Sequence, residues 1–201
     1  MRIAVISEAS TRTKNKDVVN ALKNQGQDII NIGMSDEFCD IDLTYNHTGF
    51  MAGAVLNLGA ADFVVGGCGT GQGFLISSMQ YPNVYCGLIA DPVDAFLFSQ
   101  INAGNCVSLA LNKGYGWAGE LNLDYMFEKL FEKAPGSGYP AERCEIQNTS
   151  RNLLKRVNAA THKTFEESVS QIDRQIIRTV LSHKPFMEII GELKPECFGK
   201  I

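Results

Sequence analysis

Five glycines surround a single cysteine in the middle of the chain. The run is GGCGTGQG, with Cys68 at its third position, and its glycines are Gly66, Gly67, Gly69, Gly71 and Gly73. A loop of this composition lets backbone N–H groups approach a ligand closely, so it suits an anion. Among such N–H groups Cys68 is expected to have thiolate character. A thiolate can remove the proton alpha to a carbonyl while the N–H groups stabilise the enediolate that forms. The run therefore predicts the chemistry of an aldose–ketose isomerase.

Other phosphate-binding loops are excluded by spacing. A dinucleotide fingerprint needs G-x-G-x-x-G, but the sixth position is Gln72 when counted from Gly67 and Phe74 when counted from Gly69. A Walker loop would end in Gly-Lys-Ser/Thr, and a cysteine phosphatase would need arginine where Phe74 stands. A tight turn with a structural cysteine is the simplest alternative. A flavin- or nucleotide-binding protein is a weaker one.

Metal and cofactor sites are not expected. The six cysteines are scattered without a C-x-x-C pair, and His47, His162 and His183 are isolated from one another. We therefore expect surface or capping roles for the histidines. We expect no metal and no cofactor.

Short apolar runs alternate with amphipathic stretches over the first two-thirds of the chain. Strands are predicted at 2–6, 28–32, 62–67, 83–88 and 105–109. Helices are predicted at 14–25, 44–58, 73–79, 93–101 and 118–132. Continuous apolar strands between helices are typical of a parallel sheet covered on both faces. We therefore predict an α/β fold with a five-stranded parallel sheet in the order 2-1-3-4-5.

In such a sheet the ligand lies at the carboxyl ends of the strands, where the strand order reverses. That point falls between the first and third strands. The first strand ends near Glu8 and the third at Cys68, so these two residues are expected to face each other. The alternative is that Glu8 only supplies a favourable negative charge at the N-terminus of the helix that follows.

A Pro/Gly/Ser-rich stretch at 134–139 interrupts this alternation. The segments 151–160 and 164–181 that follow are polar and helical in pattern. We predict an α/β domain over 1–143 and a helical C-terminal extension over 144–201. The extension is expected to pack on its own subunit or on a partner subunit.

Overall composition gives weaker guidance. The 201 residues carry a formal net charge of -4 and are 45% apolar, which gives no reason to expect nucleic-acid binding. The N-terminal run RIAVI is too short for a signal peptide, and no apolar run approaches a membrane span. We expect a cytoplasmic protein without membrane contact.

Three segments together resemble one family. The loop VVGGCGTGQG, the segment DPVDAFLFSQINAGN and the opening RIAVISE resemble ribose-5-phosphate isomerase B and the galactose-6-phosphate isomerase subunits, over about residues 1–143. The resemblance implies a flavodoxin-like three-layer sandwich. It also implies a homodimer or homotetramer with the active site between subunits. The activity implied is that of a sugar aldose–ketose isomerase, an intramolecular oxidoreductase.

Site residues follow from this resemblance one by one. Cys68 matches the catalytic base, and Thr70 matches the threonine that assists proton transfer between the two oxygens. Tyr45 lies at the spacing of an active-site tyrosine, and Asn102 matches an asparagine that the neighbouring subunit contributes. The anion-binding loop matches Gly69, Gly71 and Gly73, and looser matches to phosphate-binding residues are Lys113 and Arg143.

Two family histidines are absent, because Ala9 and Ile101 stand in their places. The missing ring-opening and phosphate-contacting groups weaken the case for a furanose phosphate. Longer members of the family resemble isomerases of 4-deoxy-5-ketouronate, whose substrate carries a carboxylate, and this chain fits that branch at least as well. The substrate is thus either a sugar phosphate or a 4-deoxy-5-keto sugar acid. The alternative is a non-catalytic sugar-phosphate or sugar-acid binding protein on the same scaffold.

An anionic substrate needs a counter-charge, and several residues could supply it. Arginine suits either phosphate or carboxylate, which favours Arg143 and Arg151. Arg12 and Lys14, just after the first strand, are further candidates for replacing the missing histidine. Trp117 suits a hydrophobic staple and a wall of the site equally well.

Overall fold

The computed structural model describes residues 1–191. Its strands are β1 (Arg2–Ser7), β2 (Asp28–Asn31), β3 (Phe63–Cys68), β4 (Cys86–Ile89) and β5 (Cys106–Ala110). The helices before the Pro/Gly/Ser-rich stretch at 134–139 are α1 (Asn15–Asn24), α2 (Tyr45–Asn57), α3 (Gln72–Ser78), α4 (Pro92–Leu97) and α5 (Gly119–Phe131). The C-terminal helices are α6 (Cys144–Thr161), α7 (Phe165–Gln171), α8 (Arg174–Ser182) and α9 (Lys184–Gly191). Shorter helical segments are the 3-10 helices η1 (Ala9–Lys14) and η3 (Ala141–Arg143) and the π-helix η2 (Phe98–Asn102).

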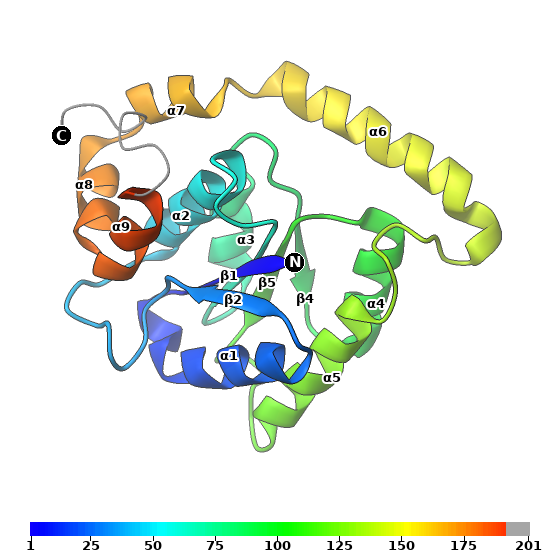
Figure 1. The fold of residues 1–201 in the computed structure, drawn as a ribbon, viewed down its shortest axis with the longest axis horizontal. Helices are drawn as coiled ribbons and strands as arrows, with labels where there is room; N and C mark the ends of the chain where they lie inside the picture. Colours follow the sequence, from blue (N-terminus) through cyan, green and yellow to red (C-terminus); the bar gives the residue numbers. More distant parts are fainter. Residues whose placement is uncertain (192–201) are drawn as a thin grey trace.

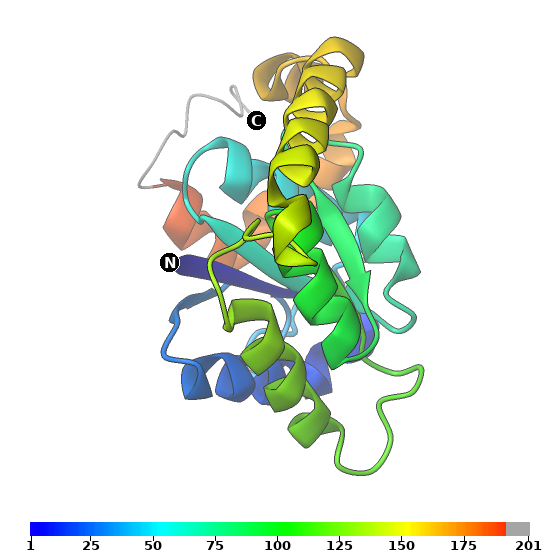
Figure 2. The same cartoon turned by 90° about the vertical axis from the view of Figure 1, so that its right-hand side faces the viewer.

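All five strands are parallel and form one sheet with a helical layer on each face (Figure 1). One buried cluster joins alternate strand residues such as Ile3 and Val5 to α1, α4 and α5. The other joins Ala4 and Ile6 to α2, α3 and the C-terminal helices. Figure 2 views the molecule from the right-hand edge of Figure 1 and shows the orange and red C-terminal helices on the side away from the blue α1 and the green α5. The predicted three-layer α/β architecture is confirmed.

The predicted strand order is wrong at one edge. The sheet runs β2-β1-β3-β5-β4 instead of 2-1-3-4-5. β5 lies beside β3, where Ser108 Oγ donates a buried hydrogen bond of 2.6 Å to the carbonyl of Gly71 in the glycine loop. β5 is buried over Cys106–Leu109, whereas three of the four β4 residues are half-buried, as suits an edge strand. The reversal also places α4 on the same face as α5 and α1. The loop after β5 therefore borders the site.

Two predicted segments need smaller corrections. The fourth strand begins at Cys86, because Asn83 has a left-handed backbone (φ 60°) and its N–H donates to Asn158 Oδ1 at 2.9 Å. The predicted helix at 164–181 is two helices, because Asp173 caps α8 by accepting a 2.8 Å hydrogen bond from the N–H of Gln175. Cys197 lies outside the described residues. No helix in the described part of the chain is long and apolar enough to cross a membrane.

The C-terminal helices pack on α2 of the same chain. α2 is buried continuously from Thr48 to Val55, so it needs cover on the side away from the sheet as well. α7 supplies Phe165 and α9 supplies Phe186 to that cover, and both side chains are almost fully buried. Figure 1 shows α7, α8 and α9 gathered beside α2, with α6 arching across to reach them.

His183, at the end of α8, anchors this helical layer to the sheet. Its side chain is buried, and Nε2 lies 3.1 Å from the carbonyl oxygen of Ile32, just beyond β2. Burial lowers the pKa of His183, and hydrogen bonds from the ring to the Gly33 and Ile32 backbone oppose that effect in part. The neutral imidazole is the form that the folded protein favours.

The protein is expected to lose stability as the pH falls through the ordinary histidine range. Because the pKa of His183 is lower in the folded than in the unfolded chain, its contribution is complete above about pH 6.5 and declines below it. His183→Gln keeps a donor for Ile32 but does not titrate, so its unfolding midpoint should fall less than that of the parent between about pH 7.5 and 5.5. His47→Gln should reduce the pH slope in the same direction, since burial also lowers the pKa of His47. Equal pH slopes for the parent and His183→Gln would contradict this account.

Candidate active site

The glycine loop lies at the carboxyl end of β3, and Cys68 is the last residue of that strand. The Cys68 side chain is buried, with 5% of its surface exposed. Gly71 has a φ of 75°, in the left-handed region that a side chain disfavours, and it precedes α3. This backbone turns the chain sharply enough to keep Thr70, which is exposed, at the mouth of the site.

The carbonyl groups of the loop are bound to the protein, whereas some of its N–H groups are free. The Cys68 carbonyl accepts from Leu111 N at 3.1 Å and from Gly71 N at 3.3 Å. The Gly69 carbonyl accepts from Lys113 N at 2.8 Å and from Asn112 N. Within residues 1–191, the N–H groups of Gly69 and Thr70 have no hydrogen-bond acceptor. The loop is fixed in place through its carbonyl groups, and these two N–H groups are free to donate to a ligand. Such an arrangement is suited to bind an oxyanion.

Glu8 lies beside this loop. The sheet register pairs Ser7 with Gly67. The residues that follow them, Glu8 and Cys68, therefore lie side by side at the carboxyl edge of the sheet. Glu8 is 9% exposed, and its Oε1 accepts a hydrogen bond from the hydroxyl of Ser10. The carboxylate is thereby held in place where the chain leaves β1 and β3 towards helices on opposite faces of the sheet, α1 and α3.

Tyr45 forms one wall near the start of α3. It is the first residue of α2, it is 47% exposed, and its ring packs against Gly73. A Cβ added to Gly73 would lie 2.8 Å from the ring, so only glycine allows this contact. His47, two residues later in the first turn, caps α2 through Nδ1, which accepts from the N–H of Thr44 at 3.0 Å. The expected capping role of His47 is thus the one observed.

The loop after β5 forms the opposite wall. Asn112 Nδ2 donates to the carbonyl of Ser10 at 3.0 Å and would lie 3.4 Å from a Cβ on Gly69. Lys113 follows and is exposed. Sequence reasoning missed Ser10 and Asn112, because their importance depends on β5 lying beside β3.

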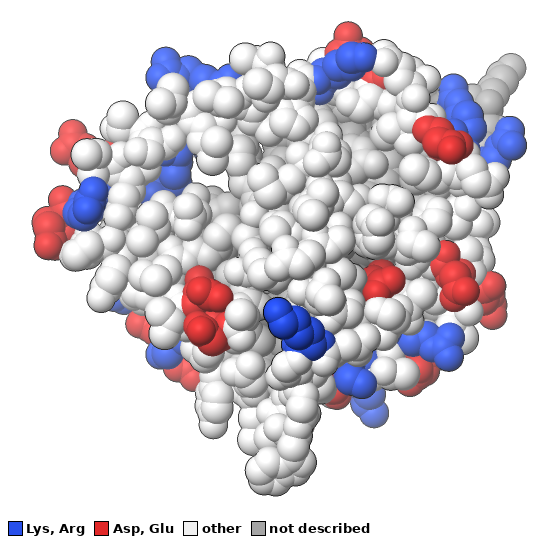
Figure 3. Space-filling view, turned by 180° about the vertical axis from the view of Figure 1, so that it is seen from behind, with Lys and Arg blue, Asp and Glu red and all other residues white. Residues whose placement is uncertain are grey.

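Two predicted site residues lie elsewhere. Asn102 ends η2 and Arg143 ends η3, and both line a groove of about 1030 Å³ between α6 and the β4 edge of the sheet. No residue of the glycine loop lines this groove. Figure 3 shows the molecule hollowed there, with Lys and Arg side chains nearby. Arg151 stabilises the groove by donating to the carbonyls of Ile101 at 2.8 Å and Gly136 at 3.2 Å.

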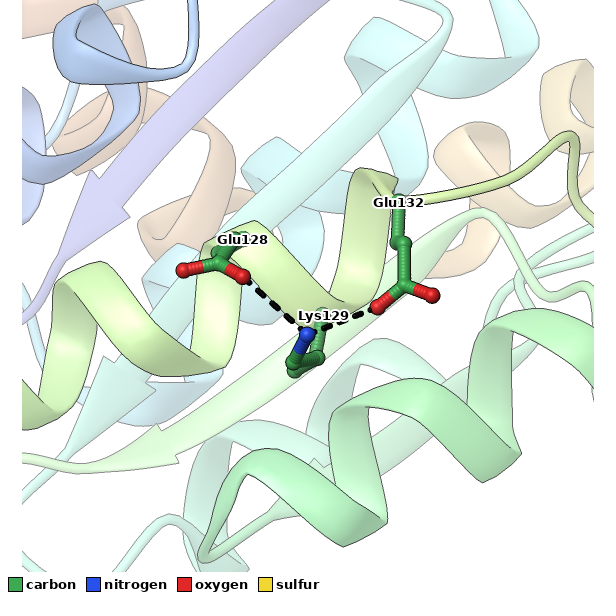
Figure 4. A network of polar contacts seen from close by, with 3 residues as sticks. All are labelled: Glu128, Lys129 and Glu132. Atoms are coloured by element: carbon green, nitrogen blue, oxygen red, sulfur yellow. Dashed lines mark hydrogen bonds and ion pairs between the residues drawn. The ribbon is translucent and has the colours of Figure 1, made fainter.

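Cations near either location are not neutralised by carboxylates. In the part of the chain that the structure describes, ion pairs join Lys129 to Glu128 and Glu132 on exposed α5 (Figure 4) and Lys184 to Glu188 on α9. Those pairs are solvent-exposed surface contacts. Lys14, Lys113 and Arg143 thus have no carboxylate within 4.0 Å among residues 1–191 and remain available to an anion.

The remaining expectations have mixed outcomes. His162 lies at the C-terminal end of α6 with Nδ1 3.1 Å from the Asn158 carbonyl oxygen, in agreement with a capping role. Trp117 is fully exposed on the β5–α5 loop, so it does not form a hydrophobic staple. That loop is the white projection at the bottom of Figure 3. No group of three or more His, Cys, Asp or Glu side chains within residues 1–191 could hold a metal ion.

Comparison with known proteins gives a consistent result. Residues 3–132 match a family model described as ribose/galactose isomerase. A solved 4-deoxy-L-threo-5-hexosulose-uronate ketol-isomerase, complexed with a tartrate, is 38% identical with a TM-score of 0.91; the match covers 98% of this chain and 95% of that one. A ribose-5-phosphate isomerase, LacAB_rpiB, from Vibrio parahaemolyticus is 46% identical, also with a TM-score of 0.91, over 96% of this chain and 92% of that one.

More distant structures share the fold. Ribose-5-phosphate isomerase B from Mycoplasma genitalium, with bound ribulose-5-phosphate, is 17% identical with a TM-score of 0.64, over 80% of this chain and 97% of that one. No match was found among proteins of curated function. The 38% and 46% matches extend over the C-terminal helices, whereas the 17% match leaves about a fifth of this chain uncovered.

Proposed function

Because the chain belongs to the ribose/galactose isomerase family, we propose that it interconverts an aldose and a ketose through a cis-enediolate, with Cys68 as the base. The observation that carries the proposal is the position of Cys68. It ends β3 beside Glu8 and precedes two loop amides that have no acceptor within residues 1–191. These are the groups that a proton transfer alpha to a carbonyl requires.

The proposed reaction moves one proton between neighbouring carbons. The Cys68 thiolate removes the proton from the carbon alpha to the carbonyl, and the N–H groups of Gly69 and Thr70 stabilise the negative oxygen that forms. The Thr70 hydroxyl assists proton transfer between the two substrate oxygens, while Glu8 and Tyr45 orient the hydroxyl groups. The Cys68 thiol exchanges its proton with solvent while the enediolate is held. Cys68 then delivers a proton to the adjacent carbon, so atoms and charge balance.

We favour a 4-deoxy-5-keto sugar acid as substrate over a sugar phosphate. The family histidines are replaced by Ala9 and Ile101. The uronate ketol-isomerase matches nearly the full length of the chain, C-terminal helices included. The ribose-5-phosphate isomerase does so too, at higher identity, so parallel assays of both substrates with deuterated water provide the test. Turnover of pentose or hexose phosphates alone would refute the uronate assignment, and the absence of solvent deuterium in the product would refute the enediolate.

A second subunit is proposed to complete the site. Asn102 and Arg143 line the groove under α6, apart from Cys68 of their own chain. α6 also presents exposed apolar side chains to solvent: Ile146, Leu153, Leu154 and Val157. Burying such a row against another copy is favourable. In a symmetric dimer the groove of one copy would then supply Asn102 and Arg143 to the crevice of the other. Within this arrangement we place the division between α/β domain and extension at residue 143.

Leu154→Glu is expected to yield a monomer with greatly reduced turnover. A charge in the middle of an apolar interface is costly to bury, and the monomer would lack Asn102 and Arg143 at its crevice. Sedimentation velocity and kcat of the same sample measure the two effects together. Thr149→Glu places the same charge on an exposed part of α6 that does not line the groove, so it should change neither. A fully active Leu154→Glu monomer would contradict the shared site.

A non-catalytic sugar-acid binder on the same scaffold is the second candidate. The loss of both histidine positions favours it. Tight binding of the keto acid without deuterium incorporation would select this function over the isomerase.

A further inference from the structure

A small polar pocket adjoins the crevice on the side of β5. It has a volume of about 430 Å³ and lies between η1, the start of α1 and the β5–α5 loop. Its lining includes Thr13, Lys14, Asp17, Asn112 and Tyr115. This volume holds the end of a small acyclic or cyclic sugar.

Asn112 lines the pocket and also contacts the glycine loop. Its side chain donates to the carbonyl of Ser10 and lies close to Gly69, while its backbone N–H donates to the Gly69 carbonyl at 3.1 Å. A substrate whose reacting carbons lie at Cys68 and Glu8 would therefore extend over Ser10 and Asn112 into the pocket.

The pocket contains a fixed ammonium group with no counter-ion. Lys14 Nζ lies 5.5 Å from the centroid of the Tyr115 ring and 3.3 Å from Thr13 Oγ1. No carboxylate lies within 4.0 Å of it in the part of the chain described. Tyr115 is itself held by Asp17, whose Oδ2 accepts from the tyrosine hydroxyl at 2.6 Å. The cation is thus positioned by a chain of contacts that leaves its charge unpaired.

We propose that this pocket binds the carboxylate of the substrate and that Lys14 is a specificity-determining residue for it. The proposal rests on the proposed isomerase function and names the substrate class of that site. Asp17 places negative charge in the lining of the pocket, so one lysine there compensates a monoanionic carboxylate better than a phosphate dianion. Arg12 is exposed on the same 3-10 helix but does not line the pocket.

Lys14→Met tests the assignment, because it removes the charge and keeps much of the side-chain length. For the 4-deoxy-5-keto sugar acid, we expect KM to rise about tenfold to a hundredfold with kcat little changed, as the loss of one charge-assisted hydrogen bond predicts. Lys14→Arg should restore most of the affinity. Lys16→Met removes an exposed lysine two residues further along the chain, in α1, that does not line the pocket, and it should leave KM unchanged. Ribose 5-phosphate, assayed in parallel, should be affected less.

Each result distinguishes the pocket from the function on which it rests. If the parent isomerises the keto acid and Lys14→Met behaves like Lys16→Met, the pocket assignment is overturned while the isomerase stands. If Lys14→Met weakens the phosphate substrate equally, selectivity for a carboxylate is overturned. If the parent turns over neither substrate, the isomerase proposal fails. Calorimetric binding of tartrate then tests the pocket alone: weaker binding to Lys14→Met supports it, and unchanged binding refutes it.

Discussion

Cys68→Ala is expected to reduce turnover by about 10²- to 10⁴-fold, the usual contribution of a positioned general base. The substrate should still bind, because the loop amides, Glu8 and the proposed Lys14 pocket remain. The decrease should therefore appear in kcat, together with loss of deuterium incorporation at the exchanging carbon. Stopped assays in deuterated water, read by NMR, measure both quantities.

Cys106→Ala provides the matched control. Cys106 is a fully buried thiol on β5, the strand next to Cys68, and burial raises its pKa well above the ordinary value. It therefore stays protonated and cannot serve as a base. Removing it should cost some stability but leave kcat and deuterium exchange near the parent values. Near-normal exchange in Cys68→Ala would show that another group moves the proton.

Phe186→Ala is expected to lower the free energy of unfolding by about 3–5 kcal/mol, the usual cost of deleting a buried phenylalanine side chain. Phe186 is fully buried on α9, in the cluster that covers α2. A loss of this size is a large fraction of the 5–15 kcal/mol typical of a single domain. Urea unfolding followed by circular dichroism measures it through the midpoint at constant slope.

Met187→Ala is the control for this prediction. Met187 is the next residue on α9 and is 38% exposed, so its truncation leaves a smaller void. Met187→Ala should lower the free energy of unfolding by much less than Phe186→Ala does. A loss below about 1 kcal/mol for Phe186→Ala would mean that α9 contributes little to the folded state.

Sequence patterns were sufficient for most elements of the α/β part. The strand and helix positions follow from apolar periodicity, and the loop around Cys68 is evident from its glycines. The order of β4 and β5 could not be predicted in this way, because both strands are short, apolar and flanked by helices. In the structure β5 is the more buried strand and is joined to the glycine loop by the hydrogen bond from Ser108 to the Gly71 carbonyl, a contact between residues 37 positions apart in the sequence.

The site was predictable to a similar extent. Cys68 and Glu8 lie together because sheet register brings strand ends to one edge, a rule that needs no side-chain detail. Asn102 and Arg143 lie apart from Cys68 of their own chain, and sequence patterns did not predict this, since their place in the proposed site depends on a second subunit. Lys14 was recognised as a cation, but its contact with Tyr115 depends on the β5–α5 loop folding back towards η1.

The position of β5 beside β3 divides the proposed enzyme into parts that can change independently. Proton transfer is assigned to the ends of β1 and β3, whose backbones are fixed by neighbouring strands. Recognition of the far end of the substrate is assigned to η1 and to residues 111–117, which lie largely on the surface. Substitutions in those surface segments can alter which sugar is accepted while the reacting groups keep their geometry. Such an arrangement allows one scaffold to acquire new substrates without rebuilding its chemistry.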